Sequence, residues 1–251
     1  MDAPSLARIL VRVAALALLF LVCAPLHLAT KAVTGTSPWP PRFLGAAAWL
    51  VGARVRVEGA PVGPHTLLIA NHVNWLDILA VAGATGAAFV SKDNLGHGFI
   101  HWLADQNHTI YVRRGHIKGA RNQAMEIAQA LEGSRPIALF PEGTVGPGTH
   151  LLPFRSTLLE AANYASKAVA IRPVALDYGP IAPDIAWFDE PAKDNVLRIL
   201  GRKGTIPIVV KLLAPLEHDG NRKSIAADAR RALEQALGFK SPQPSPIGSG
   251  Q

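Results

Sequence analysis

The sequence predicts an α/β fold: a single domain with a central mixed β-sheet flanked by helices, preceded by an N-terminal hydrophobic membrane-associated helix. Two observations predict this fold. Short strand-like runs alternate with helical patterns over most of the 251 residues, an alternation typical of α/β proteins. An apolar run comes before this alternation begins. We therefore expect a membrane anchor at residues 1–33, the functional domain at residues 42–240 and a disordered tail at residues 241–251, which are rich in Pro, Ser and Gly.

The N-terminal run contains twelve consecutive residues without a polar side chain, at positions 13–24. A helix of that length spans about 18 Å, less than the ~30 Å of a bilayer's hydrocarbon core. The longer stretch at residues 6–29 includes two arginines, a proline and a histidine. We therefore expect an anchor that is tilted, re-entrant or lying at the interface. A cleaved signal peptide and a buried core helix are the alternatives.

Basic residues outnumber acidic ones and give a formal net charge of +7, which favours an anionic partner. Arg8 and Arg12 are four residues apart, on one face of the first helix, near the end where long side chains reach the head groups. No run of five basic residues and no zinc-finger pattern occurs, so nucleic acid is not expected. The residues expected to meet an anionic membrane surface are Arg8, Arg12, Lys31, Arg42, Arg54 and Arg56.

The next elements along the chain follow from periodicity. A polar, proline-rich stretch at residues 34–41 predicts a loop, and strict alternation at residues 53–58 predicts a half-exposed strand. Apolar runs that end at turn residues predict the other strands, at residues 66–70, 87–91, 109–112, 136–140, 169–176 and 206–213. Helical spacing predicts helices at residues 75–81, 99–104, 118–131, 154–167 and 221–237, the last of them amphipathic.

A histidine and an aspartate stand where the buried strand at 66–70 turns into a helix. The sequence there is Asn-His-Val-Asn-Trp-Leu-Asp, with His72 and Asp77 five residues apart. A strand-to-helix turn can bring such a pair together. A carboxylate on one ring nitrogen fixes the imidazole tautomer and leaves the other nitrogen as a general base. From spacing alone, a structural histidine at the turn remains the alternative.

Two further segments end predicted strands with groups suited to binding an anion. Phe-Pro-Glu-Gly-Thr at residues 140–144 follows an apolar strand, and its glycine lets the backbone approach a ligand. Tyr-Val-Arg-Arg-Gly at residues 111–115 ends another strand with paired guanidinium groups, which suit bidentate recognition of phosphate or carboxylate. Taken singly, an ordinary turn and a solvated strand end are the alternatives.

In this order and spacing, the three segments resemble the PlsC-like glycerolipid acyltransferase family over about residues 42–215. The resemblance implies that His72 and Asp77 are the catalytic pair. It implies that Arg114 contacts the substrate phosphate, with Arg113 in the position that usually holds an Asp. Residues 171–175, Ile-Arg-Pro-Val-Ala, resemble the family's fourth motif. The remaining residues expected to bind substrate are Glu142, Gly143, Thr144 and Lys92.

The resemblance also implies a reaction. An acyl group would pass from acyl-CoA or acyl-carrier protein to the free hydroxyl of a lysolipid, with no other cofactor and no metal. The expected acceptor is 1-acyl-sn-glycerol-3-phosphate, which gives phosphatidic acid, and lyso-ornithine lipid or another lysophospholipid is the alternative. We expect the bacterial inner membrane, with the site on the cytoplasmic side. Outside this class, a thioesterase, in which the pair activates water, and a non-catalytic membrane-binding module remain open.

Overall fold

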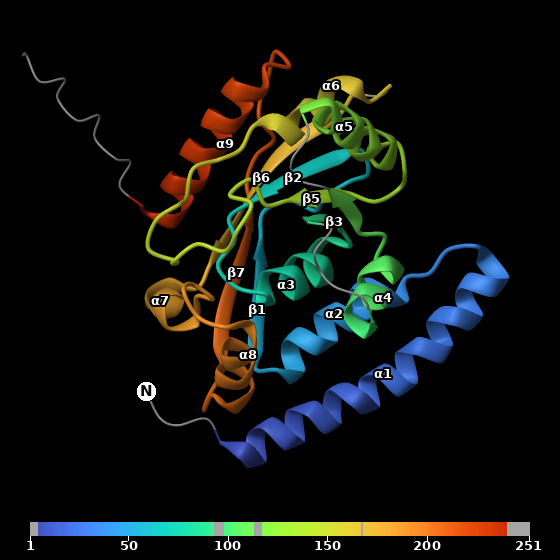
Figure 1. Cartoon of the computed structure of the whole chain (residues 1–251), viewed down its shortest axis with the longest axis vertical. Coiled ribbons are helices and arrows are strands. Elements are labelled where there is room, and N and C mark those ends of the chain that lie inside the picture. The colour runs from blue at the N-terminus through green and yellow to red at the C-terminus, as the bar shows by residue number, and fades with distance from the viewer. Residues whose placement is uncertain (1–4, 93–97, 113–116, 167, 240–251) are drawn as a thin grey trace, which may run out of the picture.

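A seven-stranded sheet forms the centre of the molecule (Figure 1). The computed structural model describes residues 5–92, 98–112, 117–166 and 168–239. The strand order is β1-β7-β6-β2-β5-β3-β4; β6 and β7 pair antiparallel and the other neighbours pair parallel, which confirms the mixed sheet. The strands are β1 Ala53–Glu58, β2 Thr66–Ala70, β3 Ala88–Lys92, β4 Ile110–Val112, β5 Ile137–Leu139, β6 Ala170–Asp177 and β7 Ile206–Leu212.

The central strand β2 explains why the sequence runs are apolar. All five of its residues are buried, and Ile69 pairs with Pro173 of β6 on one side and with Leu139 of β5 on the other. A parallel strand covered on both faces needs apolar side chains in both directions. The position of β2 in the middle of the sheet therefore places its carboxyl end, where the histidine motif begins, deep in the molecule.

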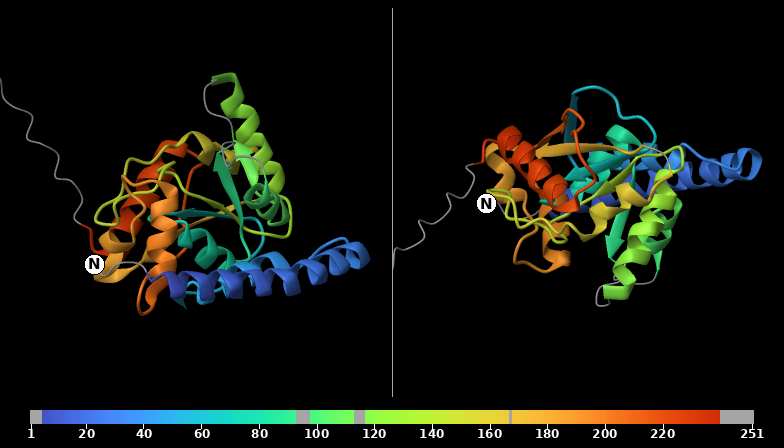
Figure 2. Two further views of the ribbon diagram at one scale, coloured as in Figure 1. Left: turned by 60° about the horizontal axis from the view of Figure 1, so that its bottom comes forward. Right: turned by 90° about the horizontal axis from the view of Figure 1, so that it is seen from above.

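Helices cover both faces of the sheet. One buried cluster joins the sheet to the first group of helices, α2 Trp39–Leu50, α3 Leu76–Thr85, α7 Ala182–Ile185 and α8 Ala192–Gly201. A second cluster joins the opposite face to α5 Ile117–Leu131, η1 Thr157–Glu160, α6 Ala161–Tyr164 and α9 Arg222–Leu237. Two short helices complete the described chain, α4 Phe99–Gln106 and η2 Gly179–Ile181. Figure 2 shows these layers from two further sides.

Helix α2 crosses α3 at two glycines. A Cβ atom added to Gly83 would lie 2.6 Å from the Cα atom of Gly45, a separation that real Cβ atoms essentially never show. The absence of both side chains is therefore what lets the two helices approach. This contact links α2 to the helix that carries Asp77.

The N-terminal helix α1, Leu6–Thr34, lies along one edge of the molecule (Figures 1 and 2). It is long and apolar enough to cross a membrane by length and composition. Its start is joined to α8: Arg8 Nε donates to the carbonyl of Gly201 at 3.0 Å, and Arg12 donates to the carbonyls of Ile199 and Leu200 at 2.9 Å each. These two side chains therefore bind the last turn of α8. The sequence interpretation had expected them to reach lipid head groups instead.

Several predictions of local structure were wrong or incomplete. The helix expected at 154–167 is confined to η1 and α6. Before it, the N–H of Arg155 donates to the carbonyl of Pro141 in the loop after β5, and after it the backbone of Ala165 is extended. Helix α2 was not predicted, and its first residues were expected as a loop; its prolines fall in the first turn, where a missing N–H costs nothing. Helices α7 and α8 were not predicted, and the expected tail at 241–251 lies outside the described residues.

Candidate active site

The histidine motif occupies the turn between β2 and α3. Parallel strands of α/β proteins place their ligand sites beyond their carboxyl ends, and His72 lies there. Asn71 fixes the start of the turn: its side chain donates to the carbonyl of Leu176 at 3.1 Å and accepts from the N–H of Leu176 at 2.8 Å. The turn is therefore anchored on β6 before the chain reaches His72.

His72 and Asp77 are in direct contact, as the spacing predicted. The Nδ1 atom of His72 lies 2.8 Å from Oδ2 of Asp77, and the imidazole stacks on the ring of Phe140 with 4.2 Å between centroids. Asp77 is fully buried, whereas 16% of the His72 side chain is exposed. Bound through Nδ1, the imidazole presents Nε2 on its other side, and His72 lines a cavity. A neutral imidazole held this way can accept a proton at Nε2 from a hydroxyl group in that cavity.

Asp77 is held by three donors besides His72. Its Oδ2 atom accepts from the backbone N–H groups of Val73 at 2.6 Å and Asn74 at 2.8 Å. Its Oδ1 atom accepts from the hydroxyl group of Tyr178 at 2.5 Å. Tyr178 is buried, and burial together with the nearby Asp77 charge raises the pKa of its hydroxyl well above its usual value, so it stays a neutral donor. These contacts fix the Asp77 side chain against the imidazole of His72.

Glu142 joins the histidine turn to the loop after β5. Its Oε1 atom accepts from the N–H of His72 at 2.9 Å and its Oε2 atom from the N–H of Leu152 at 2.8 Å. The side chain is buried, and burial raises its pKa to about 6 in spite of these two bonds. The N–H of Gly146 also donates to the carbonyl of His72, at 2.6 Å. In the structure, Glu142 therefore supports the backbone of His72; its predicted contact with substrate stays a prediction.

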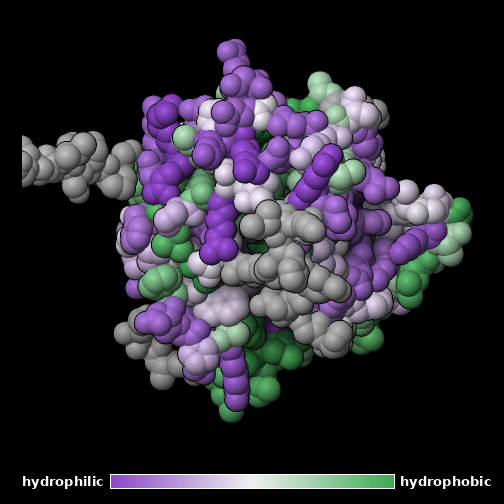
Figure 3. All heavy atoms as spheres, turned by 45° about the horizontal axis from the view of Figure 1, so that its top comes forward, coloured by the Kyte–Doolittle hydropathy of each residue, from purple (hydrophilic) through white to green (hydrophobic). Residues whose placement is uncertain are grey.

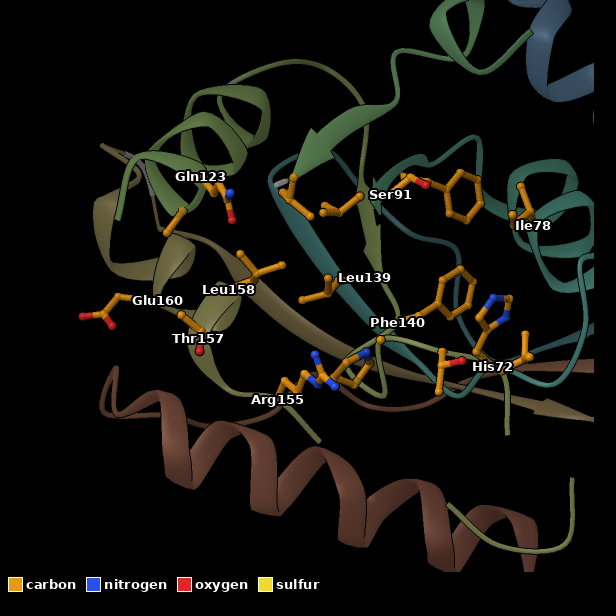
Figure 4. Close-up of a pocket in the computed structure, with 18 of the residues that line it drawn as sticks. His72, Ile78, Ser91, Gln123, Leu139, Phe140, Arg155, Thr157, Leu158 and Glu160 are labelled. Atoms are coloured by element: carbon orange, nitrogen blue, oxygen red, sulfur yellow. The ribbon is translucent and has the colours of Figure 1, made fainter. Parts of the chain in front are cut away.

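The cavity beside His72 has a volume of about 1390 Å³ and runs along the carboxyl edge of the sheet (Figure 4). Of the residues predicted to bind substrate, Gly143 and Thr144 line it. Its wall includes the apolar side chains Phe89, Val90, Val112, Leu139, Phe140 and Leu158. A partly apolar cavity of this kind can hold a small-molecule substrate beside the imidazole.

Three predicted substrate contacts are not placed by the structure. Arg113 and Arg114 lie outside the described residues, and so does the side chain of Lys92. The fourth motif is described: the Arg172 guanidinium donates to the carbonyls of Leu213, Pro61 and Leu212 at 2.6 to 3.1 Å. Arg172 therefore binds backbone around the end of β7.

Sequence reasoning missed the segment between α7 and α8. The N–H of Trp187 donates to the carbonyl of Val73 at 2.9 Å, next to His72. Asn74 and Trp75 both donate to Oδ1 of the buried Asn195, at 3.0 and 3.1 Å. These bonds hold the segment against the histidine turn, and Trp187, Asp189 and Glu190 line the cavity. The asparagine at position 74 was the signal in the sequence, and it did not identify its partner, because Asn195 is 121 residues away.

Known proteins are similar to this chain over most of its length. The model of the acyltransferase family matches residues 54–177. A lyso-ornithine lipid O-acyltransferase of Rhodobacter capsulatus is 29% identical over an alignment that covers 93% of this chain and 91% of that protein. A protein of the same name from Pseudomonas aeruginosa is 32% identical, with coverage of 73% and 72%. The crystal structure of the 1-acyl-sn-glycerophosphate (LPA) acyltransferase PlsC from Thermotoga maritima has a TM-score of 0.55 at 22% identity, covers 81% of this chain and 80% of that one, and shows a common fold.

Proposed function

Because this chain belongs to the acyltransferase family, we propose that it transfers an acyl group from a thioester to the hydroxyl group of a lysolipid. The observation that carries the proposal is the bond between His72 and the buried Asp77 at the wall of a cavity. No nucleophile of the enzyme is needed, because the acceptor hydroxyl attacks. His72 Nε2 takes the hydroxyl proton as the oxygen bonds to the thioester carbonyl carbon. The carbon–sulfur bond then breaks, and the leaving thiolate takes the proton from His72.

Substitution of the base tests this proposal. His72→Ala removes the proton acceptor, and we expect acyl transfer to fall about 10²–10⁴-fold while the protein keeps its fold. The measurement is product analysis with labelled acyl-CoA, with and without lysolipid, together with circular dichroism. Wild-type turnover by folded His72→Ala would remove His72 from the mechanism. Release of free fatty acid at the same rate with or without lysolipid would identify a thioesterase instead.

We propose a lyso-ornithine lipid as the acceptor, in place of 1-acyl-sn-glycerol-3-phosphate. Relatives that align over most of this chain carry that name. The cavity supports the choice: Asp189 makes no ion pair with any described residue and adjoins Trp187, which is bonded to the histidine turn. A free carboxylate and an indole ring attract the amino group of an ornithine and not a phosphate. Arg114 remains the proposed contact of the acceptor's anionic group.

A panel of acceptors tests this choice. We expect a higher kcat/KM for lyso-ornithine lipid than for 1-acyl-sn-glycerol-3-phosphate. Asp189→Asn should lower the ratio of these two kcat/KM values. Asp184→Asn is the matched control, because Asp184 is exposed on α7 and is not among the residues that line the cavity. A preference for the phosphate acceptor in the unaltered enzyme would contradict the proposed acceptor and leave acyl transfer in place.

We also propose that the enzyme acts at a membrane surface, with α1 lying along it. Apolar residues on the side of α1 away from the domain are exposed, among them Leu10, Val11, Leu18, Leu21 and Val22. Its other side packs on α2, and its first turns bind α8. A helix held along its length to a folded domain cannot cross a bilayer without that domain, so an orientation in the interface fits it better. Acyl-CoA or acyl-carrier protein is the proposed donor, and the cytoplasmic side of the inner membrane the proposed site.

A further inference from the structure

Three arginines line the cavity away from the imidazole of His72, one of them midway along it and one beside Glu160 at the other end. They come from separate elements: Arg121 from α5, Arg155 from the segment before η1 and Arg222 from the first turn of α9. One carboxylate, Glu160, lines the cavity beside them. We call Arg121, Arg155 and Arg222 the arginine cluster. Its charge is opposite to that of Asp189 and Glu190, which line the cavity on the segment bonded to the histidine turn.

The arginine cluster is not neutralised within the described chain. Arg222 pairs with Glu160 at 2.6 Å. The Arg121 guanidinium lies 5.9 Å from the centre of the Tyr164 ring, a contact that leaves its positive charge in place. Arg155 is held by its backbone N–H, bonded to the carbonyl of Pro141, and its guanidinium has no ion pair among the described residues. Two of the three guanidinium groups therefore have no carboxylate partner in the part of the chain that is described.

Figure 4 shows how the cluster is placed relative to the base. His72 and Phe140 lie at one end of the cavity and Glu160 at the other, with Arg155, Leu139 and Leu158 between them. Because Arg222 is bonded to Glu160, its guanidinium belongs to the end remote from His72. An anion at that end is thus separated from His72 by the stretch of cavity that Leu139, Leu158 and Arg155 line.

Resting on the proposed acyl transfer, we propose that the arginine cluster binds the phosphate groups of the acyl donor, a phosphopantetheine thioester. In such a donor, a pantetheine arm separates the thioester from the first phosphate. With the thioester at His72, the arm would lie along Leu139 and Leu158 and the phosphate would reach the cluster. The anionic group of a lysolipid is a few bonds from the attacked hydroxyl, so it stays near His72. Guanidinium groups in fork geometry suit phosphate oxygens.

Kinetics with donors that differ only in phosphate test the assignment. We expect Arg121→Gln, Arg155→Gln and the double variant to raise the KM for acyl-CoA, by about tenfold for each arginine, with the KM for lysolipid and kcat unchanged. With acyl-pantetheine, which carries no phosphate, the same variants should match the unaltered enzyme. Arg231→Gln is the matched control, because this arginine is exposed on α9, pairs with Asp228 and does not line the cavity.

Two further measurements extend the test. The first distinguishes which phosphate of the donor the arginine cluster binds, and the second separates donor binding from the proposed acyl transfer. Acyl-carrier protein brings only the phosphopantetheine phosphate, so a loss with both donors assigns that phosphate, and a loss with acyl-CoA alone assigns the nucleotide phosphates. Calorimetry measures the equilibrium binding of CoA without any turnover. Weaker CoA binding by the variants would support the role of the arginine cluster even if no acceptor is acylated. Three results would each overturn the assignment of the arginine cluster: a raised KM for lysolipid alone, an equal loss of kcat/KM with acyl-pantetheine, or unchanged CoA binding in the double variant.

Discussion

Asp77 receives four hydrogen bonds, and one of them comes from a residue distant in the sequence, Tyr178. Removing that hydroxyl with Tyr178→Phe leaves Oδ1 of a buried carboxylate without a partner. We expect a loss of about 1–3 kcal/mol in the free energy of unfolding. We also expect a lower kcat with an unchanged acceptor KM, because Asp77 is fully buried and contacts the proposed base, His72. Denaturant unfolding and steady-state kinetics measure the two effects. Tyr164→Phe, at a more exposed tyrosine, is the control, and equal kcat in the two variants would contradict the role of Tyr178.

Glu142 makes stability depend on pH. Its pKa in the folded protein is about 6, above the ordinary value of 4.5, because burial disfavours the charged form. The folded state therefore binds a proton at Glu142 more tightly than the unfolded chain does. The resulting contribution to the free energy of unfolding is complete below pH 4.5 and is lost as the pH rises through 6. We expect the loss to reach up to about 2 kcal/mol. Unfolding measured from pH 4 to 7 should show this slope in the unaltered protein and a reduced slope in Glu142→Gln. Identical slopes would exclude Glu142 as its source.

At the residue scale, the sequence predicted the contact between His72 and Asp77 but not the residues that hold Asp77 in place. His72 and Asp77 are near neighbours, so their spacing and motif were readable. Tyr178 and Asn195 reach the same turn through the sheet and α8, and no local pattern marks them. Gly143 and Thr144, expected to bind substrate, line the cavity, and their contact with substrate stays a prediction. The burial of Glu142 against two backbone N–H groups depends on how the loop after β5 packs.

At the scale of elements, the contact between α2 and α3 depends on Gly45 and Gly83. Alanine in a helix is ordinarily more stable than glycine by up to about 1 kcal/mol. At Gly83 the added Cβ would meet backbone 2.6 Å away, so the helices must separate. We expect Gly83→Ala to destabilise the protein by about 1–3 kcal/mol and to lower kcat, since α3 carries Asp77. Thermal unfolding measures the loss of stability. Gly63→Ala is the control, because no heavy atom lies within 4 Å of a Cβ added at Gly63. A higher Tm for Gly83→Ala would show that the helices tolerate separation.

Elements with strong periodicity were predictable, and those fixed by tertiary contacts were not. The bounds of β1 and β2 agree with the alternating and apolar runs that predicted them. Helix α8 was missed although it carries the buried Asn195, whose partners Asn74 and Trp75 come from another part of the chain. The helix expected over 154–167 is reduced to η1 and α6, which end where the backbone of Ala165 is extended. Helix α8 shows that contacts between distant parts of the chain fix an element that no local pattern marks.

At the scale of the whole molecule, apolar surface is concentrated on one side. The ring of Phe20 in α1 contacts that of Phe99 at the start of α4, with 5.0 Å between centroids, and the neighbouring Ile100 is exposed. Figure 3 shows hydrophilic residues over the upper part of the face it presents and hydrophobic residues at its lower edge. A surface divided in this way suits a protein that rests on a bilayer, with α1 and the start of α4 toward the lipid.

The exposed leucines of α1 provide the test of that orientation. Leu18 and Leu21 are 64% and 67% exposed, so their replacement leaves the core intact. In Leu18→Glu/Leu21→Glu, two apolar side chains are lost from the lipid contact and two charges must enter it. We expect binding to vesicles of phosphatidylglycerol and phosphatidylethanolamine to weaken by about tenfold or more, as measured by co-flotation.

Met125→Glu is the control, because Met125 is an exposed apolar residue on α5, away from α1. Since the imidazole, Asp77 and the cavity are untouched, activity on a short-chain, soluble acceptor should remain while activity on vesicle-bound lysolipid falls. Equal losses on both acceptors would place α1 in the catalytic fold and not on the membrane.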